Sequence, residues 1–445
     1  MIQDAIRYYH ELLETKHLDS TGEILGSANE KLSVAGRPVC SVLRPCFIEE
    51  KTYSYVKNAS TLVMNGIAVL CRKLLSDDEL RKQMDLSPAE EAILHVPTGY
   101  GLPDVSARLD GFLAEDGSFH FVEYNADSPG GIGYGDALGE LFFSMPILDE
   151  FSRRFPCTAV PVRSIAFQAL VRAYHKWGGK GLPAIAIIDW KETATSPEFL
   201  LFQEFFERRG CSVRIGDPRD LEYKNGRLNL GDFAIDLVYK RLVVGEMLSR
   251  MGTENALVRA ARDGAVCVAN GFSVQMAFRK NLFALLSDPV HSNLFDDSLR
   301  RAIDQHIPWT RRVRECKTTV GDREIDLVPF IGSNRDHLVL KPGGDYGGRG
   351  VVLGWEVTEP EWSSALEHAL SESYVVQERV PLARETYPAI RDGKLHFDER
   401  YFDLDPYVWN GERIEGCGVR LSRVALLNVS AGGGSATPMF ILKNA

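Results

Sequence analysis

The sequence has no Cys-x-x-Cys pair among its eight cysteines, no apolar run long enough to cross a membrane and no excess of basic residues. Scattered cysteines indicate free thiols in a reducing compartment rather than a zinc site or a disulfide framework. A membrane span would need about 20 apolar residues in a row. The N-terminal segment carries charges of both signs and lacks the apolar core of a signal peptide. We therefore expect a cytoplasmic protein that has no membrane partner.

The charge balance argues against nucleic acid as a partner. Lys and Arg total 51 against 61 Asp and Glu, which gives a net charge of −10, whereas binding to a phosphate backbone needs a clustered basic surface. A local basic site for an anionic ligand is compatible with this balance. The 445 residues are 44% hydrophobic and 10% aromatic, enough for a large core and about two to four domains.

The hydrophobic pattern divides the chain into three regions. Residues 1–155 are mostly helical at first, and the period of their pattern changes to two around residue 107. Residues 156–265 alternate short apolar runs with helical patterns, as in a compact α/β unit. Residues 266–445 alternate helix, glycine-rich loop and strand. The sequence therefore predicts a mixed α/β fold.

The middle region carries specific local signals. Residues 184–189 form an apolar run typical of a buried parallel strand. A helix should follow, with Ser196 as its N-cap and Gly210 at its end. Asn225-Gly226, between two strand patterns, predicts a two-residue hairpin turn.

A second hairpin is predicted to carry a pair of acidic residues. Asp116-Gly117 lies between two alternating segments, which favours a two-residue type I′ turn. With this turn, Asp110 lies directly opposite Glu123, and Arg108 lies opposite Asn125. All four side chains then share one face of the hairpin.

Two carboxylates that face each other across a hairpin repel. The arrangement is favourable if a cation lies between them, and carboxylate and amide oxygens are ligands that select Mg²⁺, which shares its other positions with water and phosphates. A solvated polar face on an ordinary hairpin explains the same pattern. A register shift of one residue would remove the pairing.

A lysine and a glycine-rich loop indicate a phosphate site. Lys341 lies at the end of the apolar strand 338–342, and residues 343–350 contain five glycines. Glycines allow backbone N–H groups to approach an anion closely, and the lysine supplies a point charge. The spacing fits neither the Walker loop nor the Rossmann fingerprint. An ordinary mobile turn is the alternative.

Three further features are weaker when each is taken alone. Gln377 and Glu378 give a polar end to an apolar strand, which suits an adenine ring but also fits an ordinary strand. Lys280 should lie at the N-terminus of an amphipathic helix, where a cation is unfavourable unless an anion offsets it. Arg420 and Gly432–Gly434 form a second region of arginine and glycine, which could equally be a flexible connection.

Taken in order, these motifs resemble the circularly permuted ATP-grasp ligases, of which the glutathionylspermidine synthase family is the best-known type. The matching motifs are Arg108-x-Asp110, Glu123-Tyr124-Asn125-Ala126-Asp127-Ser128-Pro129, the helix Arg279–Leu286, Lys341-Pro342 with Gly348-Arg349-Gly350-Val351, and Gly418-Val419-Arg420. The carboxylates precede the lysines, which is the permuted order. Two departures are a longer phosphate loop without a glutamate after Arg349 and the segment Ser128–Gly135 in place of the family threonine.

The resemblance implies an α/β ATP-grasp fold, circularly permuted, with a Rossmann-like unit. Residues 1–155 would hold a helical region and the metal-binding half of the ATP-grasp, residues 156–265 the Rossmann-like domain, and residues 266–445 the half with the lysines and the glycine-rich loop. The implied small-molecule partners are a carboxylate and an amine, and a homodimer is one expected assembly.

The resemblance also implies an activity. The enzyme would use ATP and Mg²⁺ to join a carboxylic acid to an amine through an acylphosphate, releasing ADP and phosphate. The implied roles are metal binding by Asp110, Glu123 and Asn125, ATP binding by Lys280, Lys341, Gly347, Gly348, Arg349, Gly350, Gln377, Glu378 and Val380, and catalysis by Arg108 and Arg420. A phosphotransferase and a catalytically silent scaffold are the alternatives, because fold resemblance does not fix function. Ser128–Gly135 and Gly432–Gly434 are assigned no role.

Overall fold

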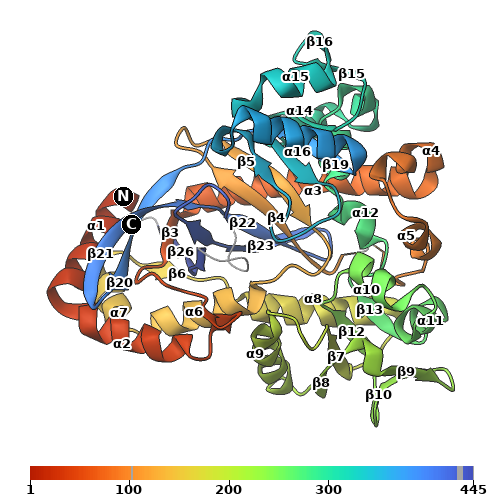
Figure 1. Ribbon diagram of the computed structural model, residues 1–445. Coiled ribbons are helices and arrows are strands. Elements are labelled where there is room, and N and C mark those ends of the chain that lie inside the picture. Colours follow the sequence, from red (N-terminus) through yellow and green to blue (C-terminus); the bar gives the residue numbers. More distant parts are fainter. Residues whose placement is uncertain (102–103, 428–433, 444–445) are drawn as a thin grey trace.

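The computed structural model describes residues 1–101, 104–427 and 434–443 (Figure 1). Of the second arginine and glycine region, Gly432 and Gly433 lie outside these described residues. Within the described residues, the structure contains no helix that combines the length and the apolar character needed to span a membrane. The eight cysteines are free thiols.

The N-terminal region is helical, as its hydrophobic pattern predicts. Its main helices are α1 (Ile2–Leu12), α2 (Leu18–Asn29) and the long α3 (Glu50–Ser76). The buried side chains of α3 recur at three- and four-residue spacing, and Gly66 on this face is approached closely by Ile303 of α14 (Asp297–His306). This spacing is what lets the helix pack one side onto the core.

The middle of the chain forms a four-stranded parallel sheet with order β13-β12-β7-β8. Its strands are β7 (Ile185–Ile188), β8 (Val213–Gly216), β12 (Leu237–Lys240) and β13 (Cys267–Ala269), accompanied by α8 (Val162–Trp177) and α9 (Ser196–Glu207). Every residue of β7 is buried, as the apolar run predicts.

Two local predictions in this unit have different outcomes. Asn225 and Gly226 both have positive φ, 54° and 71°, and join β9 (Leu221–Lys224) to β10 (Arg227–Leu230) as the predicted two-residue turn. The predicted cap of α9 is displaced by one residue, because Thr195 rather than Ser196 is the N-cap. The helix also ends at Glu207, before Gly210.

The third part of the chain builds an antiparallel sheet with order β14-β19-β17-β18. Its strands are β14 (Thr310–Arg312), β17 (Leu338–Pro342), β18 (Val352–Leu353) and β19 (Tyr374–Glu378). Helix α16 (Glu359–Ser371) lies against β17 and β19, and α15 (Leu327–Ser333) lies against α16. All five residues of β17 are buried, so the strand that ends in Lys341 and Pro342 is a central element of this sheet.

Strands from the two ends of the chain pair with each other. β4 (Ser106–Leu113) and β5 (Phe119–Asn125) share a sheet with β22 (Asp405–Trp409) and β23 (Arg413–Gly418), in the order β23-β22-β4-β5. A neighbouring sheet contains β20 (Arg384–Arg391), β21 (Lys394–Phe402), β24 (Arg420–Ser422) and β25 (Ser435–Ala436). β26 (Met439–Leu442) runs parallel to β3 (Cys46–Glu49), and Figure 1 shows both chain ends on the side that carries β20 and β21. The hairpin with the acid pair is therefore joined, through β4, to a strand from the last part of the chain.

Candidate active site

The β4–β5 hairpin places Asp110 opposite Glu123 and Arg108 opposite Asn125, which confirms the predicted pairing. The predicted turn is wrong, however. Ala114 N–H donates to Ser118 O (2.8 Å), so the loop is one residue longer than a type I′ turn, and only Gly117 of Asp116-Gly117 has positive φ. A bulge after Asp110 shifts the register back by one residue. The extra loop residue and the bulge offset each other, so Asp110 still lies opposite Glu123.

Asp110 is held by two arginines rather than left facing Glu123 alone. Arg108 donates from Nε to Oδ1 (2.7 Å) and from Nη2 to Oδ2 (3.0 Å), and Arg420 Nη2 donates to Oδ2 (2.7 Å). The remaining Nη1 of Arg108 donates to the carbonyl of Gly130 (2.8 Å). The predicted catalytic arginines therefore meet at the predicted metal ligand.

Two carboxylates that the sequence analysis missed complete this cluster. Asp403 accepts from Arg420 N–H (2.7 Å) and from Arg420 Nε (2.7 Å), and Asp405 Oδ2 lies 3.0 Å from Arg420 Nε. Both carboxylates are fully buried. The alternation of Asp403 and Asp405 around the buried Leu404 was the available signal, since period two places both acids on one side of an extended segment.

The three carboxyl groups differ in their pKa. Burial raises the pKa of Asp110, but the charges of Arg108 and Arg420 outweigh burial and hold it below its usual range. Burial, together with repulsion from Asp110, raises the pKa of Asp403 and, more strongly, that of Asp405, although Arg420 lowers both. Asp110 is therefore the carboxylate of this cluster that stays ionised most readily.

Lys341 reaches the same hairpin from β17. Its Nζ donates to Gln377 Oε1 (2.6 Å) and to the backbone carbonyl of Val122 (3.2 Å), next to Glu123. The Gln377 amide in turn donates to Thr310 Oγ1 (3.0 Å). The pKa of Lys341 is lowered to about 8, mainly by burial; the charge of Glu123 opposes this shift, and the charge of Lys280 contributes to it. Lys341 and Gln377, predicted separately, are direct partners.

Lys280 joins the acid pair to the glycine-rich loop. Its Nζ donates to the carbonyl of Asp345 (2.7 Å) and lies 3.5 Å from Glu123 Oε1. As predicted, it lies at a helix start, because it is the N-cap of α13 (Asn281–Leu286). That helix is not amphipathic, since all six of its residues are buried.

The neighbours of Lys280 are anchored to the N-terminal region. Arg279 donates to both carboxylate oxygens of Glu90 (2.7 and 2.6 Å), and Asn281 donates to Asp85 Oδ2 (2.9 Å). These contacts fix the backbone on each side of Lys280.

The predicted adenine and loop residues are more exposed. Glu378 is exposed, with its N–H bonded to Trp309 O (2.8 Å), and Val380 is half-buried. In the loop, Gly347, Gly348 and Gly350 have positive φ, and the exposed Arg349 lies over the ring of Tyr346. Backbone turns of this kind expose N–H groups. Contacts of these residues with a nucleotide stay a prediction.

The segment after Asn125 is tied to the parallel sheet. Lys240, at the end of β12, forms a fully buried ion pair with Asp127, whose other oxygen accepts from Val244 N–H (2.7 Å). Arg241 donates to Pro129 O (2.7 Å) and to Glu198 Oε2 (3.3 Å). Segment Ser128–Gly135 is thus held at the carboxyl edge of the sheet, the edge where open α/β sheets bind ligands.

The predicted metal ligands suit Mg²⁺ by the chemistry of their donors. Asp110, Glu123 and Asn125 offer two carboxylates and an amide from neighbouring positions of one hairpin, and Mg²⁺ keeps open positions for phosphate and water. Among the described residues, no three His, Cys, Asp or Glu side chains gather closely enough to hold a metal by themselves. The metal assignment stays a prediction.

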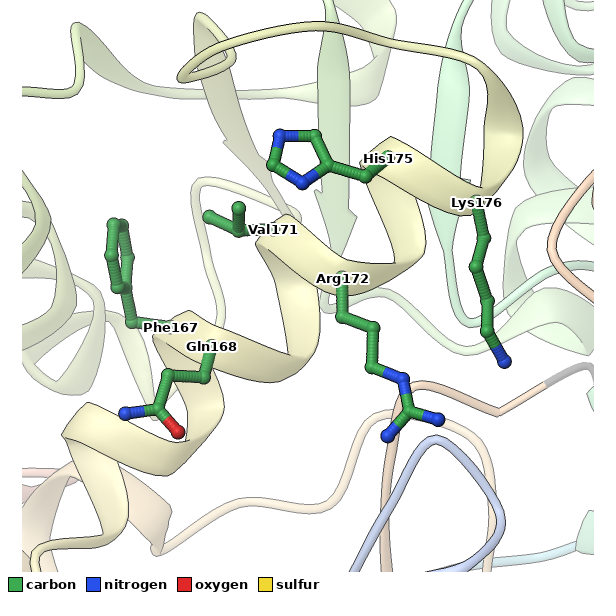
Figure 2. A pocket seen from close by; sticks show the side chains of 6 residues that line it. All are labelled: Phe167, Gln168, Val171, Arg172, His175 and Lys176. Carbon is green, nitrogen blue, oxygen red and sulfur yellow. The ribbon is translucent and has the colours of Figure 1, made fainter.

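Two surface pockets lie away from this cluster. One pocket, of about 560 Å³, lies along one side of α8, and Figure 2 shows the side chains that line it. Its lining residues are Phe167, Gln168, Val171, Arg172, His175 and Lys176. A second cavity, of about 370 Å³, lies between α6 (Ile132–Phe143) and the starts of α8 and β26. Neither is lined by a predicted site residue, so we place the site by its side-chain contacts.

Comparison with known proteins shows distant relatives. No family model matches the chain. A Frankia alni protein, provisionally named glutamate–cysteine ligase 2-3, is 26% identical over 353 residues, which cover 74% of this chain and 38% of that protein. An uncharacterized protein of Mycobacterium tuberculosis is 24% identical over 395 residues, covering 82% of this chain and 64% of its own. The chain spans less than two fifths of the length of its relatives with ligase names.

The fold itself has a solved counterpart. A glutathione synthetase-like effector from Globodera pallida matches with a TM-score of 0.62 over 95% of both chains, at 12% sequence identity. This likeness confirms the predicted fold class: the chain has an α/β ATP-grasp fold.

The contact between Lys280 and the glycine-rich loop leads to a test of the loop as a lid. We expect proteases to cleave within residues 343–350 in the free protein and more slowly with ATP and Mg²⁺, because phosphates would hold the loop N–H groups. Limited proteolysis followed by mass spectrometry measures this. The exposed hairpin turn at Asn225-Gly226 is an internal control whose cleavage should not change. Equal protection of both segments would contradict a lid.

Proposed function

We propose that this protein is an ATP-dependent ligase that joins a carboxylic acid to an amine through an acylphosphate, with release of ADP and phosphate. The observation that carries the proposal is the meeting of two lysines with one acidic hairpin. Lys341 Nζ contacts Val122 O at 3.2 Å, and Lys280 Nζ lies 3.5 Å from Glu123. A site where lysine side chains lie next to carboxylates suits a polyphosphate together with its metal ion.

Each group would have one part in the reaction. Lys280 and Lys341 would bind the phosphates of ATP, the loop Gly347–Gly350 would cover them, and Glu378 and Val380 would lie at the adenine. Gln377 would act by holding Lys341, since both ends of its amide are already bonded. Such a reaction requires positioning and charge stabilisation rather than a side-chain nucleophile.

Mg²⁺ held by Asp110, Glu123 and Asn125 would neutralise charge on the transferring phosphoryl group. Arg420 is the arginine best placed to contact an anionic ligand. Its side chain is 23% exposed, and its hydrogen bonds to the described residues use the backbone N–H, Nε and Nη2 but not Nη1. All three side-chain nitrogens of Arg108 donate hydrogen bonds. Arg420 would therefore contact the acylphosphate, and Arg108 would orient Asp110.

The names of the relatives suggest which substrates to test first. Glutamate as the acid and cysteine as the amine are the initial pair, because two relatives have glutamate–cysteine ligase in their provisional names. ADP release should depend on ATP, an acid and an amine together. Hydroxylamine in place of the amine should trap the activated acid as a hydroxamate.

The same assay separates the alternatives. A phosphotransferase would release ADP with a single acceptor and would form no hydroxamate. A silent scaffold would release no ADP under any combination. Either result across a panel of amino acids and small peptides would refute the ligase.

A further inference from the structure

The short segment Asp403–Asp405 lies where the chain passes from one sheet to another. It leads from β21 into β22, of which Asp405 is the first residue. Arg420 starts β24 one residue after β23 ends, and Asp405 pairs with Gly418 at the end of β23, so the two crossing segments run side by side. Asp403 N–H donates to Arg420 O (3.2 Å), and Arg420 N–H donates back to Asp403 Oδ1 (2.7 Å). This exchange fixes the backbone of Arg420.

The same segment also holds the Arg420 side chain. Nε is 2.7 Å from Asp403 Oδ2 and 3.0 Å from Asp405 Oδ2, and Nη2 is 2.7 Å from both Asp403 Oδ2 and Asp110 Oδ2. One edge of the planar guanidinium is thus fully occupied by carboxylates. With Nε and Nη2 of Arg420 turned toward the carboxylates, its Nη1 points away from them.

The segment reaches the metal-binding strand as well. Leu404 N–H donates to Gly111 O (2.9 Å), and Gly111 N–H donates to Asp405 Oδ1 (3.2 Å). Gly111 adjoins the bulge that follows Asp110, and a Cβ at this position would come within 2.7 Å of the Phe119 ring. The bulge that sets the direction of Asp110 is therefore bonded on both sides to one segment.

We infer that Asp403 and Asp405 are positioning residues that act in the reaction through Arg420, by holding its guanidinium against Asp110. The inference rests on the proposed function for its catalytic consequence. Two fully buried carboxylates are costly unless they are paired. Asp403 accepts from the backbone and the side chain of Arg420. Asp405 Oδ1 accepts from Gly111 N–H beside Asp110, and its Oδ2 lies 3.0 Å from Arg420 Nε as an ion pair without a hydrogen bond.

A first experiment tests whether these carboxylates hold the guanidinium, and it does not require enzymatic turnover. Arg420→Ala leaves Asp110, Asp403 and Asp405 around an empty space, so methylguanidinium should bind there and raise the melting temperature of this variant by a few degrees. Wild type should not respond. Arg420→Ala combined with Asp403→Asn should lose most of the response, and an equal shift in both variants would overturn the inference.

A double-mutant cycle tests the action through Arg420. Asp403→Asn should lower kcat for ADP release at least about tenfold, with KM for ATP nearly unchanged, yet have an effect of less than about twofold when Arg420 is already alanine. Asp403→Glu should restore part of the loss. Independent, multiplying effects of the two substitutions would overturn the inference.

A control variant separates an effect on the position of Arg420 from a general loss of protein stability. Glu385→Gln removes the charge of another ion pair, between the half-buried Glu385 of β20 and the buried Arg44 (2.9 Å), and neither residue contacts Arg420 in a hydrogen bond or ion pair of the described residues. It should lower the melting temperature while leaving kcat unchanged. If wild type releases no ADP with any acid and amine, the proposed function fails. The methylguanidinium experiment then decides by itself whether Asp403 holds the Arg420 guanidinium in position.

Discussion

Glu123→Gln should reduce turnover by at least about 100-fold, the scale of losing one stabilising charge at a reacting phosphoryl group. Glutamine keeps the shape of the side chain but removes the negative charge that Lys280 and a bound Mg²⁺ would share. Initial rates of ADP release measure the effect. Retention of most of the turnover would remove Glu123 from the metal site, and with it a main support for a ligase.

The stability of the same variant differs from what the facing carboxylates alone suggest. Relief of repulsion from Asp110 would stabilise the free protein by up to about 1 kcal/mol. In the structure, Asp110 is already neutralised by Arg108 and Arg420, and Glu123 lies 3.5 Å from Lys280. We therefore expect a loss of no more than about 1 kcal/mol in the free energy of unfolding.

The hairpin supplies its own control for this variant. Asp116→Asn removes a carboxylate from the exposed turn at the other end of the hairpin, where Asp116 Oδ1 accepts from Ser118 N–H (2.8 Å). Asparagine can keep this bond, so turnover should stay at the wild-type level. A comparable loss in both variants would mean that the hairpin as a whole, rather than the charge of Glu123, controls activity.

Local signals predicted the elements well where the local sequence alone sets the backbone. Asn225-Gly226 forms the expected turn because both residues accept positive φ. Asp116-Gly117 does not, and the longer loop is compensated by the bulge after Asp110. That bulge is bonded to Asp405, at the other end of the chain. The correct pairing of the acid residues was therefore reached with a wrong turn.

Residues that depend on distant partners were the ones that sequence reasoning missed. Asp403 and Asp405 become part of the site because β22 pairs with β4, and no local pattern reports that pairing. The burial of every residue of α13 has the same origin, since this helix lies against both α3 and β14. Periodicity describes one face of an element and does not report how many neighbours enclose it.

The second large effect is expected from Lys341→Met, as a loss of ATP affinity together with its pH dependence. Below its pKa of about 8, Lys341 is charged and can bind phosphate. Above that value binding must take up a proton, so the affinity of wild type should fall by up to about tenfold per pH unit. The methionine variant should bind about 10–100-fold more weakly at pH 7, and nearly independently of pH around 8.

Calorimetric titration with a non-hydrolysable ATP analogue at pH 7, 8 and 9 measures both effects. Lys317→Met is the matched control, because Lys317 is exposed and pairs with Glu324 on the surface. Its affinity should follow that of wild type at every pH. An unchanged dissociation constant in Lys341→Met would exclude Lys341 from the phosphate site.

The same buried lysine makes the stability of the free protein depend on pH in a defined window. The unfolded chain keeps the Lys341 proton up to its ordinary pKa of 10.5, whereas the folded protein keeps it only up to about 8. Between these values the unfolded state binds more protons, so this lysine makes the free energy of unfolding rise with pH, by at most about 1.4 kcal/mol per pH unit. Lys341→Met should lack this contribution. Denaturant unfolding of both proteins at pH 7.5, 8.5 and 9.5 measures the difference. If the free energy of unfolding had the same pH dependence in both proteins, folding would not lower the pKa of Lys341.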